Sequence, residues 1–212
     1  MITNIKTIIL GGLAGNCYLI KNHTGFILID TGDKSKRKKL EKELDKSGCT
    51  SKNLKLILIT HGDSDHTGNC AYLKEKYNTK VAMHFRDEKK LNQRRINKTS
   101  KFLFRSILYF FRKIESFEPD LNVDEGFSLS TYGMNARILY LPGHSKGSIG
   151  VLTDDGDLFC GDLFTNNKKP QLNRINENKR EIISSLWKLK NFFIHTVYPG
   201  HGAPFPINSL ER

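Results

Sequence analysis

Several features that mark particular classes of protein are missing from this sequence of 212 residues. No apolar run approaches the roughly 20 residues that a membrane-spanning helix needs. There is no internal repeat and no low-complexity linker, which excludes a repeat array and a fibrous or disordered chain. A content of 38% hydrophobic and 26% charged residues is ordinary for a globular protein. We therefore expect one domain that covers residues 1–212.

Cysteine is also scarce. The four cysteines form no CxxC pair and no dense framework. A chain of this length can bury an adequate core without disulfides, so reduced thiols in a cytosolic protein are expected. The N-terminal stretch is fairly apolar, but Gly11, Gly12 and Gly15 interrupt the continuous apolar region that a secretory signal needs. The sequence therefore predicts a cytoplasmic protein.

Acidic residues are too few to balance the basic ones, and the formal net charge is +12. Such an excess raises nucleic acid or an anionic membrane as partners. Lysine outnumbers arginine 24 to 10, which indicates a general compositional bias more than a phosphate-reading surface. Most of the surplus lies in residues 86–113, with ten basic and two acidic side chains.

Strand-like and helix-like patterns alternate along the chain. Short β-rich runs predict strands at 6–10, 17–21, 26–30, 54–60, 80–83, 136–141, 148–153, 157–160 and 196–198. Periodic stretches predict helices at 34–46, 67–77 and 179–191. Hairpin strands followed by strand–helix alternation indicate an α/β fold of two sheets with helices packed outside.

Candidate metal ligands gather where predicted strands end. Four of them fall within six residues directly after the strand at 54–60, namely His61, Asp63, Asp65 and His66. Three more follow later strands and lie beside glycines, namely His144, Asp162 and His201. A polar surface loop would explain the first group but not the second. Imidazoles and carboxylates together suit Zn, Fe or Mn, whereas Ca and Mg prefer oxygen ligands alone.

These residues occur in motifs that resemble those of the metallo-β-lactamase-fold hydrolase superfamily. In order, the motifs are ILIDTG at 27–32, HxDxDHTG at 61–68, PGHSxGS at 142–148, CGD at 160–162 and PGHG at 199–202. Five motifs in the correct order are far more specific than any single one. The resemblance implies a four-layer αββα sandwich with a binuclear metal site at one edge of the sheets, in the glyoxalase II-like or lactonase-like branch.

The resemblance also implies a role for each motif residue. His61 and His144 would bind the first metal. Asp65, His66 and His201 would bind the second, and Asp162 would bridge the two. Asp30 would orient a ligand histidine or the backbone beneath the motif. The nucleophile would be a hydroxide on the binuclear metal site, which Asp65 could orient or deprotonate. Lys146 could contribute positive charge for an anionic substrate.

Asp63 stands where the resembled family usually has histidine, so the motif is HxDxDH in place of HxHxDH. We expect two divalent ions, in the first instance Zn, with Asp63 as a further ligand of the first metal. Its hard oxygen shifts the preference towards Fe or Mn. A carboxylate at this position also occurs in the flavodiiron proteins, a redox branch of the same fold. The alternative is that Asp63 points away and leaves a mononuclear or asymmetric site.

Three functions remain open on the sequence. The first is a metal-dependent hydrolase of a small-molecule ester, thioester or lactone. A phosphodiesterase or nuclease is supported only by the charge, and a diiron-type redox protein only by Asp63. Since eleven residues follow His201, we expect no long C-terminal extension of the glyoxalase II kind. A generic relative is therefore favoured over a true hydroxyacylglutathione hydrolase.

Residues 86–114 are predicted to be a basic helical insertion in this domain. Within it, Leu103, Ile107 and Phe110 recur at helical spacing, so residues 99–114 form an amphipathic helix too short to span a membrane. In the resembled family, insertions here often cover the active site or mediate dimerisation. We expect a lid or a homodimer contact. A helix lying on an anionic membrane is the alternative.

Overall fold

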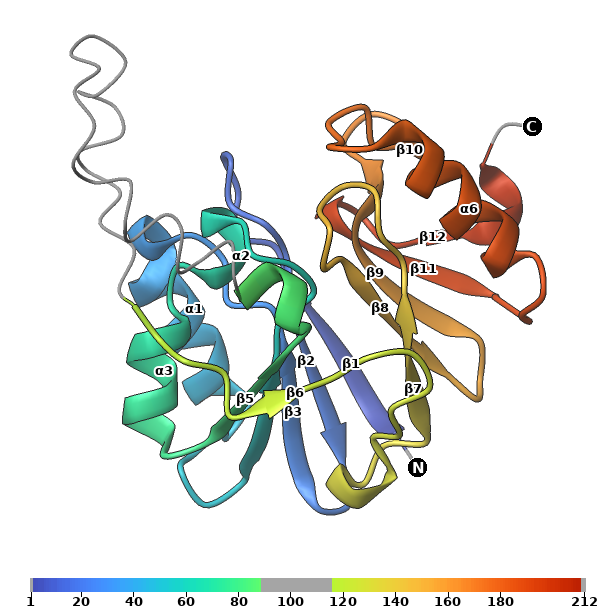
Figure 1. Ribbon diagram of the computed structural model, residues 1–212. Coiled ribbons are helices and arrows are strands. Elements are labelled where there is room, and N and C mark those ends of the chain that lie inside the picture. The colour runs from blue at the N-terminus through green and yellow to red at the C-terminus, as the bar shows by residue number, and fades with distance from the viewer. Residues whose placement is uncertain (1, 89–115, 211–212) are drawn as a thin grey trace, which may run out of the picture.

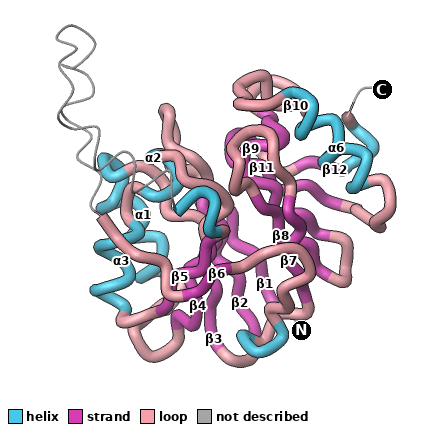
Figure 2. Tube along the Cα trace, viewed as in Figure 1, coloured by secondary structure: helices cyan, strands magenta, loops and turns pink. Residues whose placement is uncertain are grey.

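The computed structural model describes residues 2–88 and 116–210. Its strands form two six-stranded sheets that pack face to face, with helices on the outer face of each sheet (Figures 1 and 2). The helices α1 (Arg37–Lys46) and α3 (Cys70–Tyr77) lie on the first sheet, and α6 (Lys179–Leu189) lies on the second. The predicted four-layer αββα sandwich is therefore confirmed.

The first sheet is part antiparallel and part parallel. Its strands, in spatial order, are β1 (Ile2–Ile8), β2 (Cys17–Asn22), β3 (Gly25–Ile29), β4 (Leu54–Leu58), β5 (Lys80–Met83) and β6 (Leu121–Asn122). The first three pair antiparallel through short turns, and β3 to β6 pair parallel. Parallel neighbours need long crossovers, which here carry α1 and α3.

The second sheet follows a similar plan. Its strands, in spatial order, are β12 (Phe205–Pro206), β11 (Thr196–Gly202), β9 (Asp157–Asn166), β8 (Ile149–Thr153) and β7 (Ala136–Tyr140), with β10 (Gln171–Leu172) beside β9. The pair of β9 and β11 is parallel, and α6 lies on the connection between them. In Figure 1, α2 (Ser64–Thr67) at the upper end of the first sheet faces the second sheet.

Strand β3 shows how the chain fills the layers between these elements. Phe26 and Leu28 pack with the apolar residues of α1 and α3, whereas Ile27 and Ile29 pack against the second sheet. Successive side chains of a strand point to opposite faces. A strand covered on both faces therefore reads as a continuous apolar run. Each such side chain contributes about 1.5–3 kcal/mol through its burial.

The helix predicted at 67–77 is interrupted. The chain forms α2, breaks, and starts again with α3. At the break, the amide of Gly68 donates to the carbonyl oxygen of Gly32 at 2.9 Å, and the side chain of Asn69 donates to the carbonyl oxygen of Thr31 at 2.7 Å. A side chain at Gly68 would collide with this backbone. Tertiary hydrogen bonds to the loop after β3 thus divide the helix, which periodicity alone does not indicate.

Strands β9 and β11 are longer than predicted. The prediction ended them at 160 and 198, so that Asp162 and His201 would follow the strands, but both residues lie inside them. The parallel pairing continues through two register shifts, beside Pro199, which has no amide hydrogen to donate, and opposite Gly161, whose φ is +51°. The bulged ladder thereby keeps both side chains at the same edge of the sheet.

Most of the predicted basic insertion, including the whole helix at 99–114, lies outside the described residues. Only its first residues, 86–88, are described, within a helical turn at 85–88. Across residues 2–88 and 116–210, no helix combines the length and apolarity that crossing a bilayer requires. All four cysteines are free and buried. Burial raises the pKa of Cys160, next to the CGD aspartate, to about 12, which makes it unsuited to nucleophilic attack.

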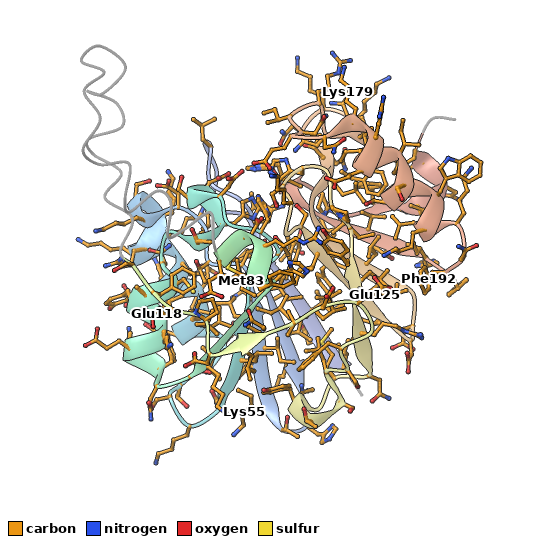
Figure 3. The ribbon with its side chains drawn as sticks, in the orientation of Figure 1. Lys55, Met83, Glu118, Glu125, Lys179 and Phe192 are labelled. Carbon is orange, nitrogen blue, oxygen red and sulfur yellow. The ribbon has the colours of Figure 1, made fainter. Side chains whose placement is uncertain are left out.

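The layered core can be tested on β4. Leu56 is fully buried between the sheets, whereas its neighbour Lys55 is exposed at the lower rim in Figure 3. Leu56→Ala should lower the free energy of unfolding by about 2–5 kcal/mol, because it removes buried methyl groups and leaves a cavity. Lys55→Ala, the control, should stay within about 0.5 kcal/mol. Urea unfolding followed by circular dichroism measures both, and equal effects would contradict the burial of Leu56.

Candidate metal centre

The segment after β4 is anchored by Asp30, which directly follows β3 in the ILIDTG motif. The amide and hydroxyl of Thr60 donate to its two carboxylate oxygens at 2.8 and 2.7 Å. Nδ1 of His66 lies 2.8 Å from Asp30 Oδ2, so Nε2 of the same ring is turned to the opposite side. Asp30 holds a left-handed φ of +58°, which costs a non-glycine residue about 1–2 kcal/mol. These hydrogen bonds offset that cost.

Asp63 and His144 come from opposite sheets and meet at the shared edge. Nε2 of His144 is 3.1 Å from Asp63 Oδ2, and Nε2 of His61 is 3.7 Å from the same oxygen. Nδ1 of His144 bonds to the carbonyl oxygen of Ile175 at 2.7 Å, which aims Nε2 towards Asp63. Asp63 therefore points into the cluster and not away from it.

Asp162 and His201 lie on the neighbouring strands β9 and β11. Nε2 of His201 is 3.2 Å from Asp65 Oδ2 and 3.5 Å from Asp162 Oδ2. The other oxygen of Asp162 lies 3.3 Å from Nε2 of His66. The second sheet thus supplies a carboxylate and an imidazole that face the residues of the HxDxDH motif.

The seven side chains form three overlapping groups, and in each group the ligand atoms lie within 4.8 Å of one another. The groups are His61, Asp63 and His144; Asp65, His66 and His201; and His61, His66 and Asp162. The third group joins the first two, because His61 and His66 each belong to two groups. The rings of these two histidines have centroids only 4.1 Å apart. The clusters are consistent with a dimetal site that these residues would hold.

Unpaired polar atoms mark the middle of this arrangement. Five buried side-chain nitrogen or oxygen atoms of the described residues have no hydrogen-bond partner, and three of them are His61 Nε2, His66 Nε2 and Asp162 Oδ1. Leaving such an atom unpaired costs about 1–3 kcal/mol, so a cluster of three calls for an explanation. They belong to the three residues of the third group. A bound cation would satisfy all three, so the donor set fits a metal centre.

Comparison with known proteins decides the family. Residues 10–201 match the family model described as the metallo-beta-lactamase superfamily. The chain belongs to the metallo-β-lactamase superfamily. This confirms the resemblance drawn from the five motifs, and the protein is a metallo-hydrolase of that superfamily.

Individual relatives agree with this assignment. The hydroxyacylglutathione hydrolase GloC of Haemophilus influenzae is 32% identical over 171 residues, which cover 76% of this chain and 72% of the relative. "Probable metallo-hydrolase YqgX" of Bacillus subtilis is 24% identical over a region that covers 91% of this chain and 87% of the Bacillus protein. The crystal structure of TTHA1623 in a di-iron-bound form superposes with a TM-score of 0.74 at 25% identity, over 96% of this chain and 95% of the other. The hydrolase is thus glyoxalase II-like by distant similarity.

Two glycines allow the backbone to pack closely against the side chains of the candidate metal centre. A Cβ at Gly15 would lie 2.6 Å from the ring of His66, and a Cβ at Gly200 would collide with Asp162. The backbone of Gly15 also donates to the carbonyl oxygen of Asp65 at 3.1 Å. Gly200 was identified by the PGHG motif, whereas Gly15 belongs to no motif. The role of Gly15 depends on how closely the loop after β1 approaches His66, which the sequence does not reveal.

Charge inside the centre is paired between imidazoles and carboxylates. Burial and the neighbouring His66 lower the pKa of His61. For His66 burial acts in the same direction, but the carboxylates of Asp30 and Asp162 outweigh it and raise its pKa. Burial alone would raise the pKa of Asp162, yet the histidines, with His66 first, hold it well below its usual range. Without a metal, protons therefore occupy part of the centre beside ionised aspartates.

Two supporting residues lie in the segment after β10, where no motif was found. The side-chain amide of Asn173 donates to Asp162 Oδ2 at 3.3 Å, and the carbonyl of Ile175 holds His144. No pattern in the sequence indicates either contact, since both depend on the path of the chain after β10, which runs back alongside β9. Lys146 lies outside the three groups, with an exposed side chain and a carbonyl oxygen that accepts from the hydroxyl of Tyr140 at 2.8 Å.

Metal binding should release protons, His201 being one source of them. Burial disfavours its charged form, but the carboxylates of Asp162 and Asp65 outweigh burial and raise its pKa to about 9. A histidine must be neutral to bind a metal, so below pH 9 an incoming ion displaces a proton from His201. Apparent zinc affinity should therefore rise with pH from 7 to about 9.

Calorimetric titration of the metal-free protein with zinc, in buffers of different ionisation enthalpy, counts the protons released. At least one should leave per protein molecule at pH 7. His201→Ala should release fewer protons, whereas His23→Ala, which changes an exposed histidine in the turn between β2 and β3, should release as many as the wild type. Affinity independent of pH would contradict the pairing of His201 with the carboxylates.

Proposed function

We propose that the protein is a dimetal hydrolase of a small-molecule thioester, with esters and lactones as related substrates and zinc as the first metal to test. One observation carries the proposal: the two three-residue groups are joined through His61, His66 and Asp162, and each of these three residues has a buried polar atom that forms no hydrogen bond. When bound by these residues, two divalent ions would polarise a substrate oxygen and lower the pKa of bound water.

Asp65 is the side chain suited to handle the attacking water. It is 22% exposed, whereas His66 beside it is fully buried, so it can meet water that enters from solvent. Burial raises the pKa of Asp65. The hydrogen bond to His201 and the charge of His66 together outweigh burial, so the pKa of Asp65 is lowered. The carboxylate is therefore ionised at neutral pH and can orient the water and take its proton.

A thioester is favoured among the substrates by the names of the relatives. Two proteins named hydroxyacylglutathione hydrolase, from Haemophilus influenzae and Vibrio vulnificus, are 32% and 28% identical to this chain. Hydroxyacylglutathione is a thioester of a small hydroxy acid. The chain covers 72% of the first relative and 52% of the second, so a glutathione thioester is the first compound to test and other thiols follow.

Loss of the central ligands tests the reaction. His66→Ala and Asp162→Ala should each lower kcat/KM for a hydroxyacyl thioester by about 10³-fold or more, because several kcal/mol of charge stabilisation are lost. His23→Ala is the matched control and should keep full activity. Hydrolysis is followed by release of the free thiol, and circular dichroism checks the fold. Activity that survives both substitutions would refute the dimetal assignment, and turnover of phosphodiesters alone would refute the substrate class.

The metal itself is tested at Asp63. Its oxygen lies within the first group, and its carboxylate favours harder ions than histidine does. Asp63→His should therefore raise zinc retention against a chelator. Asp45→His, which adds a histidine on the exposed side of α1, should not. Unchanged retention in Asp63→His would argue against Asp63 as a ligand.

Iron in the purified protein would favour the second candidate, a diiron-type redox protein. That candidate is supported by Asp63 and by a relative whose structure is described as di-iron-bound. Zinc as the sole metal, together with hydrolytic turnover, would exclude it. Metal analysis of protein purified with and without oxygen distinguishes the two.

A further inference from the structure

Asp87 is a fully buried carboxylate that belongs to none of the motifs and to none of the three ligand groups. It lies in the helical turn at 85–88 that follows β5, and its exposed fraction is 0%. Removing a carboxylate from water is costly unless its oxygens are hydrogen-bonded. Its Oδ2 accepts from the amide of Gly62 and the hydroxyl of Ser145, both at 2.6 Å, and its Oδ1 accepts from the amide of Gly147 at 2.7 Å.

The three donors come from two loops that both carry first-metal residues. Gly62 lies between His61 and Asp63 in the chain, and Ser145 directly follows His144. One carboxylate therefore bonds both of the loops that build the first ligand group. Among the described residues, none of its hydrogen bonds reaches Asp65, His66 or His201, which build the second group.

The two glycines bring these loops unusually close to Asp87. A Cβ at Gly147 would lie 2.5 Å from the Asp87 amide nitrogen and 2.7 Å from its Oδ1. A Cβ at Gly62 would lie 3.2 Å from the Asp87 carbonyl oxygen. Ser145 is held in addition by Ser148, whose hydroxyl lies 2.8 Å from its own. Asp87 is thus tightly packed between the loop of Gly62 and the loop of Ser145 and Gly147, which leaves both loops little freedom to shift.

We propose that Asp87 is a positioning residue for the first metal: its carboxylate sets the distance between the loop of His61 and Asp63 and the loop of His144. The inference rests on the proposed function, since it assumes that the first group binds an ion. The negative charge is essential because all three partners are donors. An asparagine would turn an NH₂ group towards an amide hydrogen and leave at least one donor unpaired.

Metal titration of Asp87→Asn tests the role. The wild type should bind two zinc ions in competition with a chromophoric chelator. In Asp87→Asn, one ion should bind about 10–100-fold more weakly, as for other residues that support metal ligands, and the other should be unchanged. Asp120→Asn is the matched control. Asp120 also accepts from a backbone amide, that of Val81 at 2.8 Å, and from Lys74 at 2.9 Å, but no described contact joins it to either loop.

The identity of the weakened site follows from a second pair of variants. In a His144→Ala background the first group is already incomplete, so Asp87→Asn should cause no further loss of metal. In a His201→Ala background it should weaken the remaining tight ion. Such non-additivity is expected only of residues that act together. Equal losses in both backgrounds, or equal weakening of both ions, would overturn the inference.

Two further outcomes separate this inference from the function on which it rests. If the wild type binds no metal, the proposed function fails, and the inference fails with it. If the wild type and Asp87→Asn both bind two ions equally well, only the inference fails. Should Asp87→Asn not fold, Ser145→Ala decides the question, because it removes one of the three hydrogen bonds. It should weaken the same ion by a smaller factor, and unchanged affinity in that variant would overturn the inference.

Discussion

The centre depends on holding several carboxylates in a region from which water is largely excluded. Burying an ionised carboxylate costs several kcal/mol unless charge and hydrogen bonds compensate for it. Four carboxylates meet at the edge of the two sheets, from Asp30, Asp63, Asp65 and Asp162, and together they carry a charge of −4 when ionised. Two divalent ions would carry +4.

Compensation extends beyond the ligand atoms. Three of the ligand residues are also bonded to residues outside the ligand groups: His66 to Asp30, His144 to the carbonyl of Ile175, and Asp162 to Asn173. Such contacts select the tautomer of a histidine and limit the rotation of a carboxylate. The geometry of the centre is therefore set before any ion arrives, and the backbone strain at Asp30 is one cost of it.

The balance of charge inside the centre differs from that of the chain as a whole. The net charge of +12 arises mainly in residues 86–113, whereas the centre is rich in carboxylates. The surplus of basic residues therefore says little about the reaction. For this basic segment the sequence leaves a lid, a partner chain and an anionic membrane as hypotheses.

Part of this protein can be derived from its sequence alone. The apolar runs of β3 and β4 and the periodicity of α6 are local patterns, and local patterns report secondary structure and layering directly. The motifs brought seven candidate ligands to attention, because residues with this chemistry stand out against their neighbours. The family assignment came from the same motifs and was confirmed.

Tertiary structure decided the rest, because long-range hydrogen bonds leave no periodic trace. Gly68 and Asn69 divide a helix through bonds to the loop after β3, and bulged pairing carries β9 past Asp162. Gly15 and Asp87 meet the ligand loops from parts of the chain that are distant in sequence. The sequence by itself determined the fold class and the family. Only the packing of the two sheets decided which atoms face one another and which neutral or charged groups hold them.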